Sequence, residues 1–308
     1  MIIIVKSFLI MKIKRKFYRN LESVLRKFII FQEKNKKNTY LQKAVQSAIY
    51  NTSPKGDVIF LNKNKQKYLV HTSDTISKKL FIDYNFDFKI IKKALKFLDK
   101  NNKRKTLLNV GANIGSICIK SVKEKLFNSA IVFEPAKSHF RLLVANIFIN
   151  KLENKIKAHQ LALSDKKKIL KLSLNQKGNL GDNRILKKTS NKKNLKIEKV
   201  KSDKLDNFTS KLNKKNSLIF MDVQGHEPYV LKGGKKTIKK KIPIVLEFSP
   251  LLLDKNWIKN FELLFRNYKY FYDLHKNKSK KILNKQNLTD LFNNLKNEKN
   301  NYTDLLIV

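Results

Sequence analysis

Cysteine, proline and glycine are all scarce in this chain of 308 residues, which has one, five and eight of them. The single cysteine, Cys118, excludes an internal disulfide framework and any zinc site built from several cysteines. The apolar start of the chain, residues 1–11, is too short to span a bilayer. A basic cluster comes after it, whereas in a secretory signal the basic residues come before the apolar ones. We therefore expect a cytoplasmic protein, with weak contact between its N-terminus and the inner membrane face as a further option.

Acidic residues are also few, with 24 Asp and Glu against 68 Lys and Arg, so the formal net charge is +44. A basic protein attracts phosphates and anionic lipids. The lysines are spread almost evenly along the chain, however, which indicates a general bias in residue usage. Neither basic residues interleaved with base-stacking aromatics nor a zinc-finger spacing occurs. We predict no specific nucleic-acid partner, and a nucleic-acid binder is the alternative.

The few glycines and prolines are unevenly placed. Seven of the eight glycines lie between residues 111 and 234, and four of the five prolines between 135 and 250. Short apolar runs recur in this part of the chain, separated by segments long enough for helices. Such alternation predicts a mostly parallel sheet with helices on both faces. We expect three parts: a helical extension (1–55), a β-hairpin and helix (56–105), and the main domain (106–308).

The stretch LLNVGANIGSICIK, residues 107–120, predicts a strand, a tight turn and a helix. In parallel sheets such a turn commonly binds a nucleotide. Gly111 would let a ligand approach the backbone, and Gly115 would let the helix pack closely. The glycine pattern differs from the dinucleotide fingerprint, which favours a smaller adenosyl ligand. Glu134 ends the next strand, where a carboxylate can accept hydrogen bonds from both hydroxyls of a ribose.

A third cluster lies in residues 218–234, where Asp222 ends an apolar strand and a turn follows at Gly225. His226 or Asp222 could accept a proton from a substrate hydroxyl, while Glu227 could equally well cap the next helix. The segment GNLGDNRI, residues 178–185, is either a loop over the site or an ordinary surface loop.

Six motifs, NVGANIG, VFEP, LALSD, LGDNRI, DVQGHEPYVLKG and LEFSP, occur in the order typical of FkbM-type methyltransferases. The resemblance covers about half of the chain, from Leu107 to Pro250. It implies the class I methyltransferase fold, a Rossmann-like, mostly parallel seven-stranded sheet, here preceded by the N-terminal extension. It also implies S-adenosylmethionine as cofactor and O-methylation of a hydroxyl on a sugar, glycan or secondary metabolite.

The motifs and the resemblance together assign roles to individual residues. The cofactor-binding residues would be Asn109, Gly111, Ala112, Asn113, Gly115, Glu134, Pro135, Ala162, Asp165 and Asp222. The catalytic residues would be Asp222, His226 and Glu227, and the substrate-binding residues would be Asn183, Arg184, Gln224 and Glu247.

Two departures from the family pattern are Asn109, where Asp is frequent, and Gln224, where Glu is frequent. Asn109 can still form hydrogen bonds, but it lacks the negative charge with which an aspartate could pair with the ammonium group of the cofactor. We expect no catalytic metal. The alternatives are an RNA methyltransferase and a non-catalytic relative that binds nucleic acid.

Overall fold

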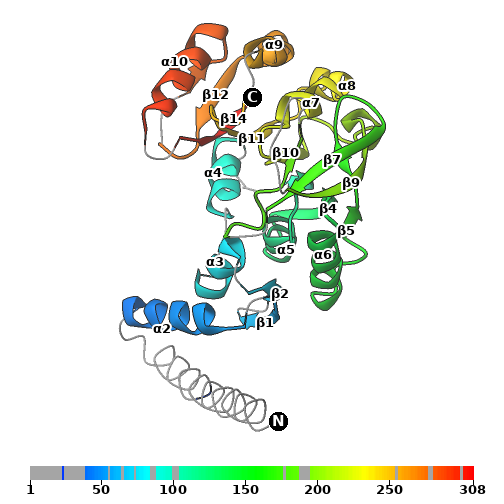
Figure 1. The fold of residues 1–308 in the computed structure, drawn as a ribbon. Coiled ribbons are helices and arrows are strands. Elements are labelled where there is room, and N and C mark those ends of the chain that lie inside the picture. The colour runs from blue at the N-terminus through cyan, green and yellow to red at the C-terminus, as the bar shows by residue number, and fades with distance from the viewer. Residues whose placement is uncertain are drawn as a thin grey trace.

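A mixed eight-stranded sheet with helices on both faces forms the centre of the molecule (Figure 1). The computed structural model describes residue 23 and residues 39–308, apart from 55, 64, 65, 73, 84–87, 99–103, 176, 177, 187–194, 254, 255, 277–279, 299 and 300. The strand order is β13-β12-β14-β11-β10-β3-β4-β5. No helix in the described ranges combines the length and apolar character that crossing a membrane requires.

The strands of this sheet are, in chain order, β3 (Arg104–Val110), β4 (Phe127–Phe133), β5 (Ile156–His159), β10 (Ser217–Met221), β11 (Ile244–Phe248), β12 (Tyr270–Asp273), β13 (Lys281–Ile282) and β14 (Thr303–Ile307). The expected mostly parallel α/β architecture is confirmed. The sheet has eight strands instead of seven because the two-residue β13 pairs with the edge strand β12.

Five neighbouring strands, β11, β10, β3, β4 and β5, run parallel. They are short apolar runs because helices cover both of their faces; all five residues of β10 are buried. Strand β14 is antiparallel to β11, with Asp304 opposite Glu247. The carboxyl ends of the parallel strands and the amino end of β14 therefore meet at one edge.

Alternate residues of β3 contribute to two separate cores. Leu107 packs in a core with α4 (Phe88–Leu98), α5 (Ser116–Lys123) and α6 (Lys137–Ile149). Leu108 and Val110 pack in the opposite core. That second core is covered by η1 (Leu205–Phe208), α7 (Glu227–Lys232), α8 (Lys235–Lys239), α9 (Trp257–Asn267) and α10 (Lys285–Lys296).

The N-terminal extension contains α2 (Thr39–Thr52), the hairpin β1 (Val58–Lys63) and β2 (Gln66–His71), and α3 (Thr75–Asp83). The backbone N–H of Leu69 in β2 donates to Asn146 Oδ1 in α6 at 2.6 Å. Apolar side chains of the extension also belong to the same core as Leu107. The division at residues 55 and 105 stays a prediction. The membrane contact expected of the first residues lies outside the described part of the chain.

A second sheet, with strand order β6-β9-β7-β8, lies beside the first. Its strands are β6 (Ala162–Leu163), β7 (Lys168–Leu174), β8 (Arg184–Ile185) and β9 (Lys196–Asp203). Residues 156–163, one of the short apolar runs in the sequence, are divided between two strands: β5 pairs with β4, and β6 pairs with β9. The inner face packs Ala162, Leu172 and Val200 against Ala136, next to the end of β4.

The turn between β3 and α5 is built on two glycines with positive φ, Gly111 at +82° and Gly115 at +92°. A Cβ at Gly111 would lie 1.9 Å from the carbonyl oxygen of Asp222. A Cβ at Gly115 would lie 2.8 Å from Ile119 in α5 and from Leu143 in α6. Gly115 allows close helix packing, as expected; at Gly111 the close neighbour is the backbone of Asp222, and the approach of a ligand stays a prediction.

Substitution of Gly111 tests this contact. Gly56 is the matched control, because its φ is +85° and a Cβ there would meet nothing within 4 Å. We expect Gly56→Ala to lower the free energy of unfolding by about 1 kcal/mol. Gly111→Ala should lower it by about 4 kcal/mol or more, because backbone must move. Urea unfolding measures both, and equal losses would contradict the contact.

Candidate active site

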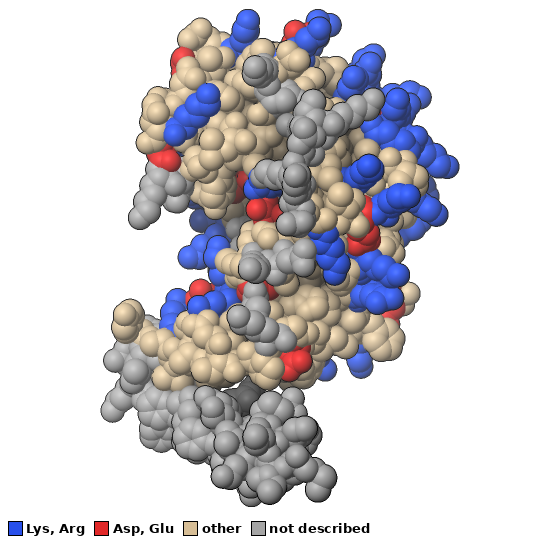
Figure 2. All heavy atoms as spheres, in the orientation of Figure 1, with Lys and Arg blue, Asp and Glu red and all other residues tan. Residues whose placement is uncertain are grey.

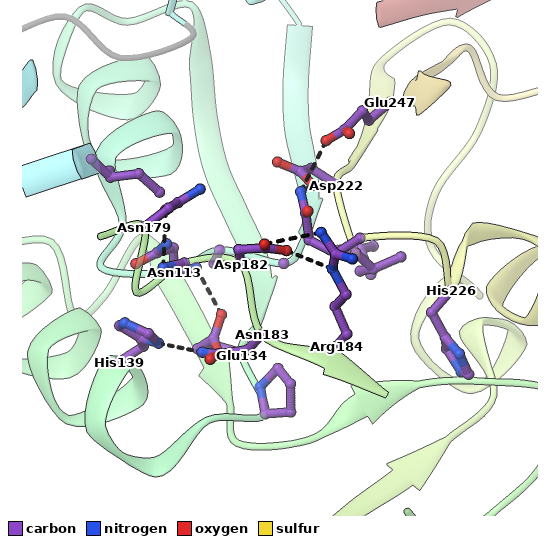
Figure 3. A pocket seen from close by; sticks show the side chains of 18 of the residues that line it. Asn113, Glu134, His139, Asn179, Asp182, Asn183, Arg184, Asp222, His226 and Glu247 are labelled. Atoms are coloured by element: carbon purple, nitrogen blue, oxygen red, sulfur yellow. Dashed lines mark hydrogen bonds and ion pairs between the residues drawn. The ribbon is translucent and has the colours of Figure 1, made fainter. Parts of the chain in front are cut away.

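A cavity of about 440 Å³ opens at the edge where the strand ends meet (Figure 3). This volume lies in the range typical of small-molecule sites. The sequence-predicted residues that line it are Gly111, Ala112, Asn113, Glu134, Pro135, Ala162, Asn183, Arg184, Asp222, Gln224, His226 and Glu247. The fold therefore brings together most of the predicted site.

Four predicted residues are not part of the described lining: Asn109, Gly115, Asp165 and Glu227. Asn109 is fully buried and, by the alternation of β3, lies on the same face as Leu107 in the core. Asp165 accepts a hydrogen bond from Lys168 Nζ at 2.8 Å, and the bonds from Lys168 and Ser164 lower its pKa despite partial burial. The proposed functions of these four residues stay predictions.

Glu134 lies at the end of β4 and is 6% exposed. Its Oε2 accepts the backbone N–H of Asn113, and its Oε1 accepts that of Ala136, both at 2.9 Å. Burial raises the pKa of Glu134 to about 7. Each carboxylate oxygen has a second lone pair, so Glu134 can hold the turn and still accept bonds from a ligand in the cavity.

Asp222 and Glu247 end neighbouring strands, and Gln224 links them. Gln224 Nε2 donates to Asp222 Oδ1 at 2.7 Å and to Glu247 Oε2 at 3.0 Å. Burial, and then the negative charge of Asp222, raise the pKa of Glu247 well above its ordinary value. Glu247 therefore takes up a proton at a higher pH than an ordinary glutamate does.

Strand β14 adds residues that the sequence analysis missed. Asp304, directly opposite Glu247, lines the cavity together with Asn301 and Tyr302. Asp304 Oδ2 lies 2.7 Å from His275 Nε2, and burial raises the pKa of this carboxyl. These residues follow the stretch that carries the family motifs, and only the antiparallel pairing places them at the site.

His226 lies apart from the two carboxyls, with its ring directed away from them in Figure 3. Its Nε2 is 3.0 Å from Ser164 Oγ, and its ring stacks on Tyr229 with centroids 4.7 Å apart. It is 8% exposed. The structure therefore does not bring His226 together with Asp222 and Glu247, and its role as a base stays a prediction.

Residues 178–185, here named the cover segment, contribute six residues to the lining: Asn179, Gly181, Asp182, Asn183, Arg184 and Ile185. Asn183 Nδ2 donates to His139 Nδ1 at 3.1 Å. Burial lowers the pKa of His139 to about 4, so its ring is neutral and can accept this bond. The Arg184 guanidinium makes two bonds to Asp182, of 2.6 and 2.9 Å.

The residues present fit an adenosyl cofactor. Gly111 and Ala112 of the turn line the cavity, next to Glu134. Asn113 also lines the cavity, and its side-chain Oδ1 is buried and has no partner among the described residues. A buried polar atom without a partner is costly, and a ligand donor could satisfy it. Within the described residues, no group of three or more His, Cys, Asp or Glu side chains could hold a metal ion.

Glu227 is 2% exposed, and its Oε1 accepts the backbone N–H of Val223 at 2.9 Å. This bond closes the turn between β10 and α7. Burial raises the pKa of Glu227 to about 7. The folded state thus holds a proton on Glu227 that the unfolded chain releases above its ordinary pKa, so this group's contribution to stability falls as the pH rises through 7.

The substitution Glu227→Gln tests this burial, because the amide retains an acceptor for Val223 and has no charge. Between pH 5 and pH 8, the free energy of unfolding of the variant should gain up to about 3 kcal/mol relative to wild type. Other titrating groups are common to both proteins and cancel. The exposed Glu153→Gln is the control and should show no such gain. Identical pH dependence in Glu227→Gln and wild type would contradict a buried, protonated Glu227.

A family model for the FkbM methyltransferase domain matches residues 109–278, which is more than half of the chain. No curated protein matches the chain.

Among solved structures, Sp1610 of Streptococcus pneumoniae is 14% identical over 70% of this chain and 66% of its own, with a TM-score of 0.37. The B. subtilis tRNA methyltransferase TrmK is 11% identical over 71% and 64%, with a TM-score of 0.36. TYW2 of M. jannaschii, solved with AdoMet, is 12% identical over 83% and 85%, with a TM-score of 0.39. The chain spans slightly less than two thirds of the first two proteins.

The family match includes the strand ends that carry Glu134, Asp222 and Glu247. The chain belongs to the FkbM family of S-adenosylmethionine-dependent methyltransferases.

Proposed function

We propose that this protein methylates a hydroxyl group on an uncharged acceptor, such as a sugar, a glycan or a secondary metabolite. When bound, S-adenosylmethionine supplies an electrophilic methyl group. The chain must bind the acceptor, align its hydroxyl and remove a proton as the new bond forms.

The acidic lining of the cavity carries this proposal. Among the described residues, five carboxyl residues line it: Glu134, Asp182, Asp222, Glu247 and Asp304. Of the two cationic residues in this described lining, Lys79 and Arg184, the second is paired with Asp182. Carboxyl groups, whether protonated or ionised, form hydrogen bonds with hydroxyl groups and offer no positive charge to a phosphate. An acidic cavity in a chain of net charge +44 therefore favours a polyhydroxyl acceptor without phosphate.

Asp222 supports the proposal as the general base. It lies beside Glu247, whose pKa is raised, and Gln224 orients it by a hydrogen bond. In the transfer, the acceptor hydroxyl would lose its proton to Asp222 while its oxygen bonds to the methyl carbon and the methyl–sulfur bond breaks. His226 is less suited, because Ser164 and Tyr229 already contact its ring.

A basic exterior favours the second candidate, an RNA methyltransferase. In Figure 2, Lys and Arg gather over the upper right of the view, where α7, α8 and β7 lie in Figure 1. On the second sheet, the exposed Lys171 and Lys199 are directly opposite each other. Like charges in such pairs repel, and an anionic ligand would relieve them. The basic surface could therefore bind the phosphates of an RNA while one of its nucleotides enters the cavity.

Transfer of tritiated methyl groups from S-adenosylmethionine separates the two candidates. We expect label in neutral oligosaccharides or polyhydroxyl metabolites, and at least tenfold less label in the phosphate ester of a labelled sugar. Label confined to RNA, with steep salt dependence, would contradict the proposal. For the accepted substrate, Asp222→Asn should lower kcat about 100-fold. His226→Asn should lower kcat less than tenfold, and the reverse order would make His226 the base.

Glu134→Gln tests cofactor binding independently of the acceptor. The amide cannot accept bonds on both sides, so either the turn or a ribose hydroxyl loses its partner. We expect the affinity for S-adenosylhomocysteine to fall at least tenfold in calorimetric titration. The control is Glu198→Gln. Glu198 lies near Glu134 and accepts the backbone N–H of Lys137, but it is not part of the described cavity lining. Equal affinities for wild type and Glu134→Gln would remove Glu134 from the cofactor site.

A further inference from the structure

Asp74, in the N-terminal extension, joins α3 to the cover segment. The residue immediately precedes α3 and is 4% exposed. Its Oδ2 accepts bonds from the backbone N–H of Ser77 at 2.8 Å and from Ser77 Oγ at 2.7 Å. Its Oδ1 accepts the backbone N–H of Leu180 in the cover segment at 2.9 Å. One buried carboxylate thus links two segments that are more than a hundred residues apart.

The backbone strengthens this link. Asp74 and Gly178 form an isolated β-bridge, and the N–H of Thr75 donates to the carbonyl of Gly178 at 3.1 Å. On the other side, the N–H of Asp74 donates to the hydroxyl oxygen of Tyr50 in α2 at 3.0 Å. The Tyr50 hydroxyl also lies 2.6 Å from the carbonyl of His71. Tyr50 therefore bonds to the backbone of Asp74, while the Asp74 carboxylate bonds to the cover segment.

The position of the cover segment matters for the cavity. Gly181 lies between α3 and the turn that joins β3 to α5. A Cβ at Gly181 would be 2.5 Å from Asn113 Nδ2 and 2.6 Å from Ile76 Cδ1. Asn183 reaches α6 through His139 at 3.1 Å. From the extension itself, Thr75, Ile76 and Lys79 line the cavity. The extension, which precedes the family match, therefore forms part of the cavity wall.

We infer that Asp74 is a positioning residue for the methyltransferase site. It holds the cover segment against Asn113, in the turn between β3 and α5. The carboxylate acts through Leu180 and does not line the cavity. A bond to a charged acceptor is stronger than one between neutral groups, and its loss leaves the Leu180 N–H without this partner. This inference concerns the cover segment and holds whichever hydroxyl is the acceptor.

The substitution Asp74→Ser separates the two functions of the carboxylate. A serine oxygen can still accept the Ser77 N–H at the start of α3, but it is too short to reach Leu180 as well. We expect amide hydrogen exchange of residues 178–185 to become at least tenfold faster, while exchange in α3 stays within a factor of three. The affinity for S-adenosylhomocysteine should fall about tenfold, because Gly181 would no longer pack against Asn113 and keep this residue in place at the cavity.

Tyr50→Phe is the matched control, because it removes a hydroxyl that bonds to the Asp74 backbone and leaves the carboxylate in place. It should lower stability to urea while exchange in the cover segment stays as in wild type. Unchanged exchange and affinity in Asp74→Ser would overturn the inference. So would equal changes in Tyr50→Phe, which would indicate general loosening of the extension. If wild type failed to bind S-adenosylhomocysteine, the cofactor assignment would fail, and exchange in 178–185 would still decide the role of Asp74.

Discussion

The close approach of Gly111 to the carbonyl of Asp222 is the contact on which the rest of the site depends. It joins the turn after β3 to the end of the neighbouring strand β10, and no side chain fits between them. The same turn presents the Asn113 N–H to Glu134 at the end of β4. Three strand ends are thereby fixed relative to one another through backbone contacts, before any ligand binds. Ligand sites at the carboxyl ends of parallel strands have this arrangement in general.

The site is also defined by the contrast between its charge and that of the surface. The chain has a net charge of +44, yet carboxyl groups dominate the cavity. Burial raises the pKa values of Glu134, Glu247 and Asp304, which reduces the repulsion among them. Carboxyl groups with shifted pKa values gathered in one cavity are typical of acid–base chemistry.

Most of the main sheet could be predicted from the sequence, because its strands are short apolar runs separated by helices. The turn at Gly111 and the acid at Glu134 follow each other at a fixed spacing, so local pattern was sufficient for them. Asp304 and His139 could not be found in this way, since antiparallel pairing and helix packing bring them to the cavity. The division of residues 156–163 between two sheets also depends on pairing partners far along the chain.

The N-terminal extension was the least predictable part. Nothing local marks Asp74 as different from any acid before a helix, and its bond to Leu180 spans 106 positions. The sequence leaves Glu227 equally open to a catalytic role and to capping of the next helix, and the structure shows that its carboxylate accepts the backbone N–H of Val223. For both Asp74 and Glu227, the sequence does not reveal which backbone group the carboxylate contacts in the fold.

The most direct test of the central claim is a crystal structure of the protein with S-adenosylhomocysteine. We expect both ribose hydroxyls within hydrogen-bond distance of Glu134 and the sulfur atom facing the side of the cavity that holds Asp222 and Glu247. A cofactor bound with its ribose away from Glu134, or outside this cavity, would contradict the proposed site.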